Sequence, residues 1–276
     1  NAGQAGTQTA AIVAGGQPPG SPYNTNTSYT YDGSSWTATN NLGTARRLAV
    51  MMGTQPAALL AGSGTSPPTT GLVATEEWDG TNWTAGGNMA TLRYGNFSGG
   101  IQTAAVIAGG SGPGTQFDDT EEYNGSSWTT VTNMPANQGN GISGADSQTD
   151  MYCVSGSPGN LTTSVVYDGT NWTSGASLSG DGRRGSGGSL ATSSGPGFIT
   201  CGETATVNPI TTTEEWNGTA FSSSTACPTA TRDQANGDNG TGAAGLVVAG
   251  YNTAIANNVF EFTGSGIIET QTITTS

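Results

Sequence analysis

Short apolar runs that end in glycine recur along the chain at a nearly constant interval. The closing glycines are 47, 47, 47, 46 and 48 residues apart. The six runs are Ile12–Gly15, Leu59–Gly62, Val106–Gly109, Cys153–Gly156, Ile199–Gly202 and Val247–Gly250. Because apolar runs this short, bounded by turn residues, are typical of buried β-strands, the pattern predicts one buried strand in each of six repeats.

An aromatic residue, a polar residue and a glycine follow each run as a second marker. The aromatic residues of this marker are Tyr31, Trp78, Tyr123, Tyr167, Trp216 and Phe262. Five residues further on, the first five repeats have a second aromatic residue and the sixth has Ile267; these aromatic residues are Trp36, Trp83, Trp128, Trp172 and Phe221. Since Asp-Gly and Asn-Gly pairs supply the positive φ angles of tight hairpins, the marker predicts a hairpin between two further strands.

Each repeat therefore contains four predicted strands: a glycine-rich strand, the apolar strand and the two strands of the hairpin. Four antiparallel strands in a unit of about 40 to 50 residues are typical of a β-propeller blade. The sequence predicts an all-β chain that forms a single six-bladed β-propeller. Its predicted blades are residues 1–43, 44–90, 91–136, 137–181, 182–230 and 231–276. Because each blade is continuous in sequence, we expect the first and last blades to pack face to face without sharing a strand.

Several of these markers together resemble kelch repeats. They are the glycine pairs Gly15-Gly16 and Gly109-Gly110, the Tyr-Asp of the third strand, the Trp of the fourth strand, and Met89-x-x-x-Arg93 before the next repeat. The third repeat departs from this pattern, since it has Asn137-Gln138 in place of the arginine. The resemblance covers the whole chain and implies a kelch-like propeller, of the kind found in phage virions and secreted bacterial proteins.

The two sets of aromatic residues have two interpretations, a binding surface for sugars or bases and a packing role. A core between blades needs one ring per blade at a fixed offset, and each ring buries a large apolar area. We therefore expect both sets to pack the blades rather than to bind a ligand.

All six basic residues are arginines, and they lie where one repeat leads into the next: Arg46, Arg47, Arg93, Arg183, Arg184 and Arg232. In a glycosidase of the sialidase kind, clustered arginines would bind a carboxylate. The Asp-box of that family is Asp-x-Gly-x-x-Trp, whereas here Gly80 follows Asp79 directly. We instead expect a structural role for Arg46, Arg93 and Arg232, which would donate to backbone carbonyls or to glutamates of the third strands. Those glutamates are Glu76, Glu77, Glu121, Glu122, Glu214 and Glu215.

The same glutamates, together with Asp118 and Asp119, could alternatively bind Ca²⁺ or act as an acid/base pair. A repeated position favours a role that the blades share, because catalysis needs a single asymmetric group of residues. No catalytic residue, metal ligand or cofactor is therefore predicted, and Ca²⁺ remains the alternative. The chain has no His, which excludes the copper site of kelch-type sugar oxidases.

The cysteines and the net charge further restrict which binding functions and covalent links are expected. Cysteines stand at 153, 201 and 227, an odd count without a C-x-x-C, so buried free thiols are predicted rather than disulfides. The net charge of −13 has the wrong sign for binding nucleic acid or an anionic membrane. No apolar stretch approaches the length of a membrane span, so no membrane insertion is expected.

The resemblance, with a frame that lacks reactive groups, implies a non-enzymatic structural or attachment module of a virus particle, such as a tail, fibre or capsid decoration. Its expected partners are other virion or surface proteins or host-surface glycans, in a virion or extracellular location, and a homo-oligomer is compatible with it. The alternative is a secreted bacterial adhesin or glycan-binding propeller that uses the variable loops 17–26, 63–71, 111–120 and 203–213. A glycoside hydrolase is the third hypothesis.

Overall fold

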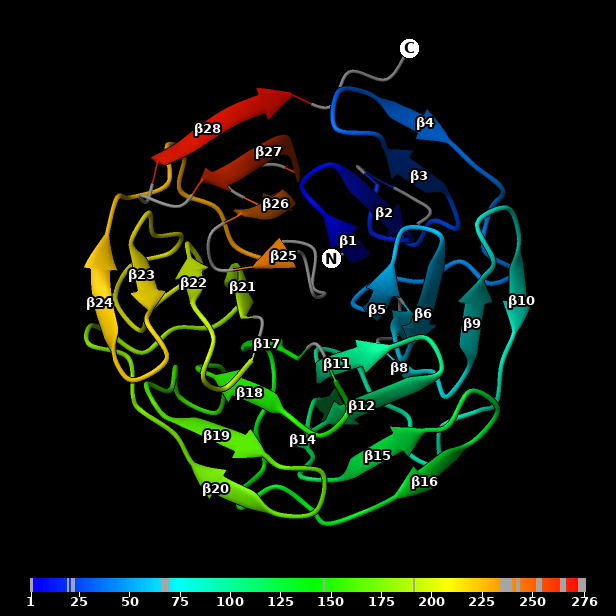
Figure 1. Cartoon of the computed structure of the whole chain (residues 1–276), viewed down its shortest axis with the longest axis horizontal. Helices are drawn as coiled ribbons and strands as arrows, with labels where there is room; N and C mark the ends of the chain where they lie inside the picture. The colour runs from blue at the N-terminus through cyan, green and yellow to red at the C-terminus, as the bar shows by residue number, and fades with distance from the viewer. Residues whose placement is uncertain are drawn as a thin grey trace.

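The computed structural model is a ring of β-sheets around one axis (Figure 1). It describes residues 2–18, 20, 23–65, 70–145, 147–190, 192–233, 240–241, 244–251, 255–263 and 267–272. Over these residues the chain forms six four-stranded antiparallel sheets and two small hairpins, without a helix. The prediction of an all-β propeller built from four-stranded antiparallel sheets is confirmed. We call the sheets blades 1 to 6 in chain order.

The strands of each blade follow one another along the chain. Blade 1 contains β1 (Gly3–Thr7), β2 (Ala10–Ala14), β3 (Ser28–Tyr31) and β4 (Trp36–Ala38). Blade 2 contains β5 (Val50–Thr54), β6 (Ala57–Ala61), β9 (Thr75–Trp78) and β10 (Trp83–Ala85). Blade 3 contains β11 (Phe97–Ile101), β12 (Ala104–Ala108), β15 (Thr120–Tyr123) and β16 (Trp128–Thr130).

The remaining blades follow in the same order. Blade 4 contains β17 (Ile142–Gly144), β18 (Met151–Val154), β19 (Ser164–Tyr167) and β20 (Trp172–Ser174). Blade 5 contains β21 (Gly187–Leu190), β22 (Gly197–Thr200), β23 (Thr213–Trp216) and β24 (Phe221–Ser224). Blade 6 contains β25 (Gly240–Thr241), β26 (Ala244–Tyr251), β27 (Ile255–Thr263) and β28 (Ile267–Thr272). The hairpins β7 (Gly64–Thr65) with β8 (Thr70–Gly71), and β13 (Ser111–Gly112) with β14 (Thr115–Gln116), extend the loops of blades 2 and 3.

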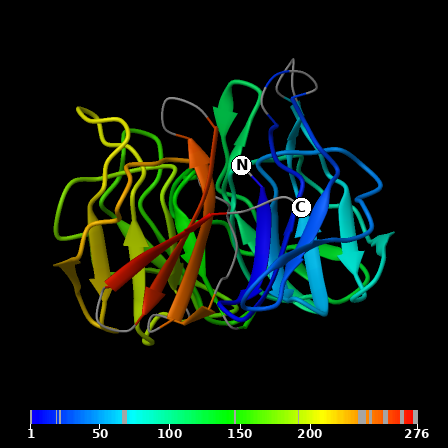
Figure 2. The same cartoon turned by 90° about the horizontal axis from the view of Figure 1, so that it is seen from above.

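The first strand of each blade lies nearest the axis and the fourth lies on the outer rim (Figure 1). We call the segment that leads from the fourth strand of one blade to the first strand of the next a junction. The junctions and the loops between second and third strands emerge on one side of the ring, which we call the loop face. Figure 2 shows several of these loops projecting along one edge, including the hairpin of β13 and β14.

Blades 1 to 5 share one plan, from which blade 6 departs. Strands in blades 1 to 5 have three to five residues, whereas β26 and β27 have eight and nine. The pairing of these two strands also shifts between Val248 and Gly250. Phe262 pairs with Ile268, so Ile267 is not the counterpart of the fourth-strand aromatic residues, which pair directly with the aromatic residue of the third strand, as in Tyr31 with Trp36. Blade 6, at the closure of the ring, is thus the blade that follows the repeat pattern least well.

Closure is made by packing of complete sheets. The inner strand β1 contacts β25 and β26, and β21 contacts the same two strands from the other side. Within the described residues, each four-stranded sheet is built from strands of its own repeat. This arrangement agrees with the expectation of face-to-face closure.

Apolar clusters fill the spaces between successive blades. Ile12 of blade 1 packs with Met51, Leu60 and Trp78 of blade 2, and these side chains are almost completely buried. Corresponding clusters join blades 2 and 3, 3 and 4, and 4 and 5. Since burying one large apolar side chain contributes about 1.5–3 kcal/mol, these clusters account for much of the cohesion between blades.

Glycine is required in the inner strands because neighbouring blades approach closely there. A Cβ atom on Gly144 would lie 1.4 Å from the carbonyl oxygen of Leu190 in the next blade. A Cβ atom on Gly99 would lie 2.3 Å from the Cβ of Ala145. Both separations are far below van der Waals contact, so the glycine-rich first strand of the repeat reflects packing near the axis.

A chain of backbone hydrogen bonds runs from junction to junction just before the inner strands. Five equivalent residues have left-handed φ angles between 54° and 61°: Leu48, Gly95, Asn140, Gly185 and Asp233. From Gly95 onward, the amide of each donates to the carbonyl of the one before it, at 3.3, 2.7, 2.8 and 2.7 Å. The left-handed conformation is uncommon for residues other than glycine, so it persists here because the bonds along the chain hold it.

Candidate functional site

The Asp-Gly and Asn-Gly turns are held by their own side chains. In blade 2, Asp79 Oδ1 accepts the amides of Thr81 at 2.8 Å and Asn82 at 2.7 Å. Asn124 and Asn217 make the same pair of bonds in blades 3 and 5. The amides of Asn82 and Thr81 hold the pKa of Asp79 below its ordinary value. The equivalent amides in blades 1 and 4 lower the pKa of Asp32 and Asp168. The exposed carboxylates of Asp32, Asp79 and Asp168 are therefore engaged within their own turns.

The two aromatic sets pack against each other within a blade. The third-strand residues Tyr31, Trp78, Tyr123, Tyr167, Trp216 and Phe262 are all buried. The fourth-strand residues Trp36, Trp83, Trp128 and Trp172 are half-buried, and Phe221 is buried. Ring centroids within a pair are 4.9 to 5.3 Å apart in blades 1 to 5. Both sets thus lie in packed positions.

The fourth-strand tryptophans also bond to the preceding blade. Trp128 Nε1 donates to Thr75 Oγ1 at 3.0 Å, and Trp172 Nε1 donates to Thr120 Oγ1 at 3.2 Å. Trp83 makes the equivalent bond to Ser28 in blade 1. These indole donors therefore join neighbouring blades.

Further bonds between blades are made by two glutamines, for which the sequence pattern predicted no role, and by a third-strand tyrosine. Gln102 lies in the turn between the first two strands of blade 3, and its Nε2 donates to the carbonyls of Ala58 and Trp78 at 3.0 and 2.7 Å. Gln148 does the same one blade later. Tyr123 donates its hydroxyl to Glu77 of blade 2, and burial, together with this carboxylate, raises the pKa of Tyr123 to about 12. The sequence signal for the glutamine bonds was a glutamine repeated at the same turn of successive repeats.

Three buried arginine–glutamate pairs, which we call clamps, tie a junction to the third strand of the following blade. In blade 3, Arg93 Nη2 lies 2.8 Å from Glu121 Oε1, and both side chains are fully buried. Arg93 Nη1 also donates to the carbonyl of Asp119 at 2.7 Å, and Glu121 Oε2 accepts the amide of Ala90 at 2.7 Å. The other two clamps are Arg46 with Glu76 at 2.5 Å and Arg183 with Glu214 at 2.7 Å.

Burial dominates the electrostatics of the clamps. It lowers the pKa of Arg93, while the charges of Glu121 and Asp119 raise it again. The same opposition acts on Arg46 and Arg183. Because removing one member of a buried ion pair leaves an uncompensated charge, such a change typically costs about 3–5 kcal/mol. The clamps are consistent with the structural role expected for Arg46 and Arg93.

Arg232 does not occupy a clamp position. The amide of Ser63 donates to the carbonyl of Arg93, and the equivalent bond at the last junction goes from Gly202 to the carbonyl of Thr231. Thr231 therefore fills the buried position, and Arg232 is one residue later. Arg232 instead pairs with Asp233 at 3.1 Å and Glu203 at 3.4 Å. Its guanidinium also lies 5.0 Å from the ring centroid of Tyr251.

The prediction of three free thiols is wrong for two of the cysteines. Cys201 and Cys227 form a disulfide, with their Cα atoms 6.7 Å apart. Cys153 is a buried free thiol, and burial raises its pKa. The paired cysteines are 26 residues apart in sequence, and only the blade brings the end of β22 beside the segment after β24.

The acidic residues considered for Ca²⁺ are engaged separately. Asp118 accepts from Asn133 at 3.3 Å, and Glu215 accepts from Ser224. Over the part of the chain that the structure describes, no three His, Cys, Asp or Glu residues are grouped so that they could hold a metal ion. Nor does a helix able to cross a membrane occur among the described residues.

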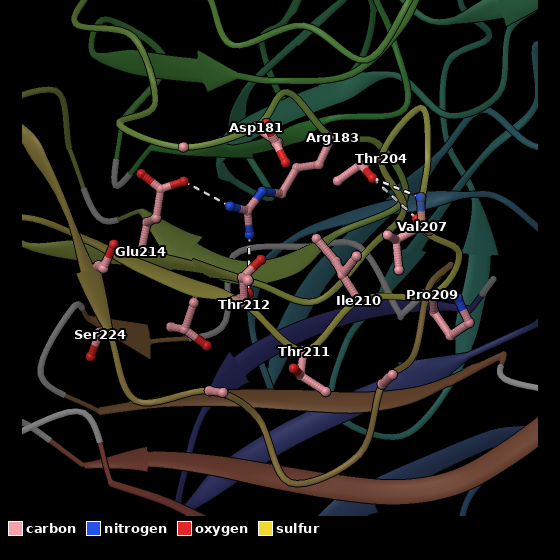
Figure 3. A pocket seen from close by; sticks show the side chains of 15 residues that line it. Asp181, Arg183, Thr204, Val207, Pro209, Ile210, Thr211, Thr212, Glu214 and Ser224 are labelled. Carbon is pink, nitrogen blue, oxygen red and sulfur yellow. Dashed lines mark hydrogen bonds and ion pairs between the residues drawn. The ribbon is translucent and has the colours of Figure 1, made fainter.

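The loop face of blades 4 and 5 is hollowed. In blade 5, a cavity of 610 Å³ lies between the junction with Asp181 and Arg183 and the loop with Thr204, Val207 and Ile210 (Figure 3). In blade 4, a cavity of 510 Å³ lies at the equivalent place, lined by residues that include Gln138, Leu161 and Val165. Four exposed large apolar side chains belong to segments of the loop face: Tyr23, Leu92, Val207 and Tyr251.

Comparison of the chain with known proteins shows which fold it shares with them. No protein-family profile matches the chain, and no curated protein sequence matches it. Among solved structures, the chain is similar to the one described as "Structure of YjhT", with a TM-score of 0.76 and 10% sequence identity. The match covers 98% of this chain and 96% of that one. At this identity the likeness concerns the fold, and the chain is accordingly a β-propeller similar in its whole length to YjhT.

Proposed function

We propose that the chain is a non-catalytic structural or attachment module of a virus particle, built on kelch-type repeats. The observation that carries the proposal is the internal pairing of its buried charges. The three clamp arginines have side chains no more than 2% exposed, and each is bonded to a glutamate of its own chain. Charges held in this way stiffen a frame and are withdrawn from ligand or substrate.

The arrangement of carboxylates favours this role over glycoside hydrolysis. A glycosidase needs two carboxyl groups that face one substrate bond, about 5 to 9.5 Å apart. The clamp glutamates Glu76, Glu121 and Glu214 instead lie in three different blades, each against its own arginine. Repetition around the ring suits a scaffold better than a single reacting centre.

The disulfide supports a location outside the reducing cytosol. Disulfides form and persist in oxidising surroundings, including virion and cell surfaces. The Cys201–Cys227 bond joins the loop-face end of blade 5 to the next junction.

The proposal is tested by locating the chain. Particles purified on a density gradient are analysed by mass spectrometry and by immunogold labelling with an antibody against the propeller. The expected result is copurification at a fixed stoichiometry with the major capsid or tail proteins. Recovery of the chain from cell envelopes or culture supernatant, and not from particles, would contradict the virion role. Hydrolysis of a chromogenic glycoside panel by the purified chain would contradict the non-catalytic part of the proposal.

The cavities of blades 4 and 5 favour a second candidate, a secreted glycan-binding propeller or adhesin. Hollows of 510 and 610 Å³ are within the range of small-ligand sites, about 300–1,000 Å³. The location experiment separates the two candidates, because an adhesin is found on cells or in the medium.

A further inference from the structure

The disulfide of blade 5 joins two positions that lie in contact in other blades as well. The first position ends the second strand and has a left-handed backbone. It is Cys201 in blade 5, with a φ of 58°, and Gly109 in blade 3, with a φ of 59°. The amides of both residues donate to the carbonyl of the residue just before the third strand, at 3.0 and 2.9 Å. Cys201 and Gly109 are therefore structurally equivalent.

The second position lies in the junction. It is Cys227 in blade 5 and Met134 in blade 3, whose amides donate to the carbonyl two residues before the third strand, at 2.9 and 2.8 Å. The Met134 sulfur covers the glycine of the first position, since a Cβ atom on Gly109 would lie 3.1 Å from it. Blade 2 has Gly62 and Met89 at these positions, with 3.5 Å between such a Cβ atom and the methionine methyl carbon. In blade 5 a covalent bond thus replaces the packing of methionine on glycine.

The junction that this disulfide holds leads into blade 6 and has no clamp over its described residues, 227–233. Its buried position is occupied by Thr231, where three other blades have an arginine and blade 4 has Gln138. The neighbouring Arg232 is 28% exposed and pairs with Asp233. The backbone bond from Gly202 to the carbonyl of Thr231 is retained at 2.8 Å. A covalent bond is therefore present at the junction whose buried position carries neither arginine nor glutamine.

This junction matters because blade 6 closes the ring. Strands β25 and β26 of blade 6 contact β21 of blade 5 and β1 of blade 1. The disulfide fixes Cys227, in the junction, to the end of the second strand of blade 5. Farther along the junction, the amides of Arg232 and Tyr251 donate to each other's carbonyls, at 2.9 and 2.7 Å, and so tie it to β26. The disulfide thus anchors the path by which the chain enters its last blade.

We propose that Cys201 and Cys227 form a one-way redox latch on the last junction. Cys201 is fully buried and Cys227 is 3% exposed, so a reagent reaches either sulfur only when the junction opens. With two thiols, the junction is held by non-covalent bonds alone, and its local opening admits a small disulfide. Once the protein disulfide has formed, opening is suppressed and a thiol no longer reaches the bond.

The latch closes when the chain passes from a reducing to an oxidising compartment, and it stays closed afterwards. This behaviour goes beyond the proposed attachment role and is independent of it, because it depends on the redox surroundings of the chain and not on what the propeller is attached to.

A small disulfide such as oxidised glutathione supplies the oxidant. The thiolate of Cys227, the more exposed of the two residues, attacks one sulfur of glutathione disulfide, whose S–S bond breaks and releases one glutathione thiolate. The thiolate of Cys201 then attacks the mixed disulfide at Cys227, so that the protein S–S bond forms and the second glutathione leaves. The two protons lost by the cysteines are taken up by the two glutathione thiolates. Two cysteine thiols are thereby oxidised, and one glutathione disulfide is reduced to two thiols.

Amide hydrogen exchange of the full chain tests the latch. The reduced chain is refolded in dithiothreitol and the oxidised chain with oxidised glutathione, and intact mass confirms each form. The amides of Cys227, Arg232 and Tyr251 should exchange about tenfold or more faster in the reduced chain, because a native disulfide suppresses opening. The equivalent amides at the junction into blade 3, those of Tyr94 and Ser111, should change little.

A matched double variant separates the covalent bond from side-chain packing. Cys201→Gly with Cys227→Met installs the pair that blade 3 uses, and glycine suits the left-handed backbone of the first position. This variant should fold, and its amide exchange should not respond to dithiothreitol. Cys153→Ala removes the buried free thiol of blade 4 and should keep the wild-type response at the last junction.

The one-way behaviour is tested by rates. Oxidation of the reduced chain by oxidised glutathione and reduction of the oxidised chain by reduced glutathione are followed by alkylation and mass. Each rate is compared with that of the same step in concentrated urea. Folding should slow reduction about tenfold or more beyond its effect on oxidation.

Equal slowing of the two steps by folding would overturn the one-way behaviour. Equal exchange of the Arg232 and Tyr251 amides in the oxidised and reduced chains would overturn the latch itself. So would an equal acceleration at Tyr94 and Ser111, because the disulfide would then act on the whole ring and not on the last junction. A response of the Cys201→Gly, Cys227→Met variant to dithiothreitol would also contradict the proposal.

Discussion

Blades 3 and 4 direct their junctions along the same path by different means. In blade 3 the Arg93–Glu121 clamp holds the junction, whereas blade 4 has Gln138 and Val165 at the two equivalent positions. Gln138 donates instead to the carbonyl of Ser155 at 2.6 Å. The backbone bond from the preceding blade is nevertheless retained, at 3.0 Å to the carbonyl of Arg93 and 2.8 Å to that of Gln138. The junction therefore does not require the ion pair to take its shape.

The two charges of the clamp are present together or absent together. Blade 4 has lost both the arginine and the glutamate, and its replacement pair is a neutral amide and an aliphatic side chain. A buried pair is often replaceable by neutral residues without loss of stability, whereas a single buried charge left behind is strongly destabilising. The arginine and the glutamate of a clamp therefore act as one unit, and the path of the junction backbone does not depend on them.

Breaking the clamp from one side should give the largest effect. Glu121→Ala leaves Arg93 buried without its counter-charge, and the free energy of unfolding should fall by about 3–5 kcal/mol. Urea denaturation followed by tryptophan fluorescence measures this. Glu122→Ala, next in the same strand, is the control and should cost clearly less. A loss below 1 kcal/mol for Glu121→Ala would show that the buried charge is relieved by water or by movement.

Removing the neutral tie of blade 4 should have a smaller effect. Gln138→Ala leaves the buried carbonyl of Ser155 without this donor, which costs about 1–3 kcal/mol. The measurement is the same urea transition. Asn137→Ala, the adjacent exposed residue, is the matched control. If Gln138→Ala were as damaging as Glu121→Ala, the distinction drawn between charged and neutral ties would fail.

Converting the clamp of blade 3 into the pair of blade 4 should be nearly neutral. The double variant Arg93→Gln with Glu121→Val removes both charges and supplies the residues that blade 4 uses. Its free energy of unfolding should lie within about 1 kcal/mol of wild type, well above either single variant. A double-mutant cycle measures the coupling. Additive losses from the two single variants would contradict the view of the clamp as a unit.

The smallest effect concerns the turns, where blade 2 has Asp79 and blade 3 has Asn124. The pKa of Asp79 is lower in the folded chain than its ordinary value of 3.8. Its contribution to stability is therefore present above that value and is lost as the pH falls below it. Asp79→Asn should flatten the decline in unfolding free energy between pH 5 and pH 2, and Asn124→Asp should steepen it. Identical pH profiles for the two variants would refute this account.

Local chemistry made much of the fold predictable. The apolar runs, the turns at Asp79 and Asn124, and the aromatic pairs such as Tyr123 with Trp128 depend on residues within a few positions of one another. The four-stranded sheets follow from these elements. The disulfide was not predictable, because the odd cysteine count and a separation of 26 residues contain no information on which sulfur atoms meet. Arg232 was misplaced because one residue of register decides which side chain is buried.

The sequence by itself determined the strands, their order within a repeat and the recurrence of an arginine at the junctions, since these depend on short-range periodicity. Only the tertiary structure decided which glutamate each arginine meets, about 30 residues further along the chain, and how blade 6 packs on blade 1. The physical reason is that these contacts join residues far apart in sequence, so no local pattern records them.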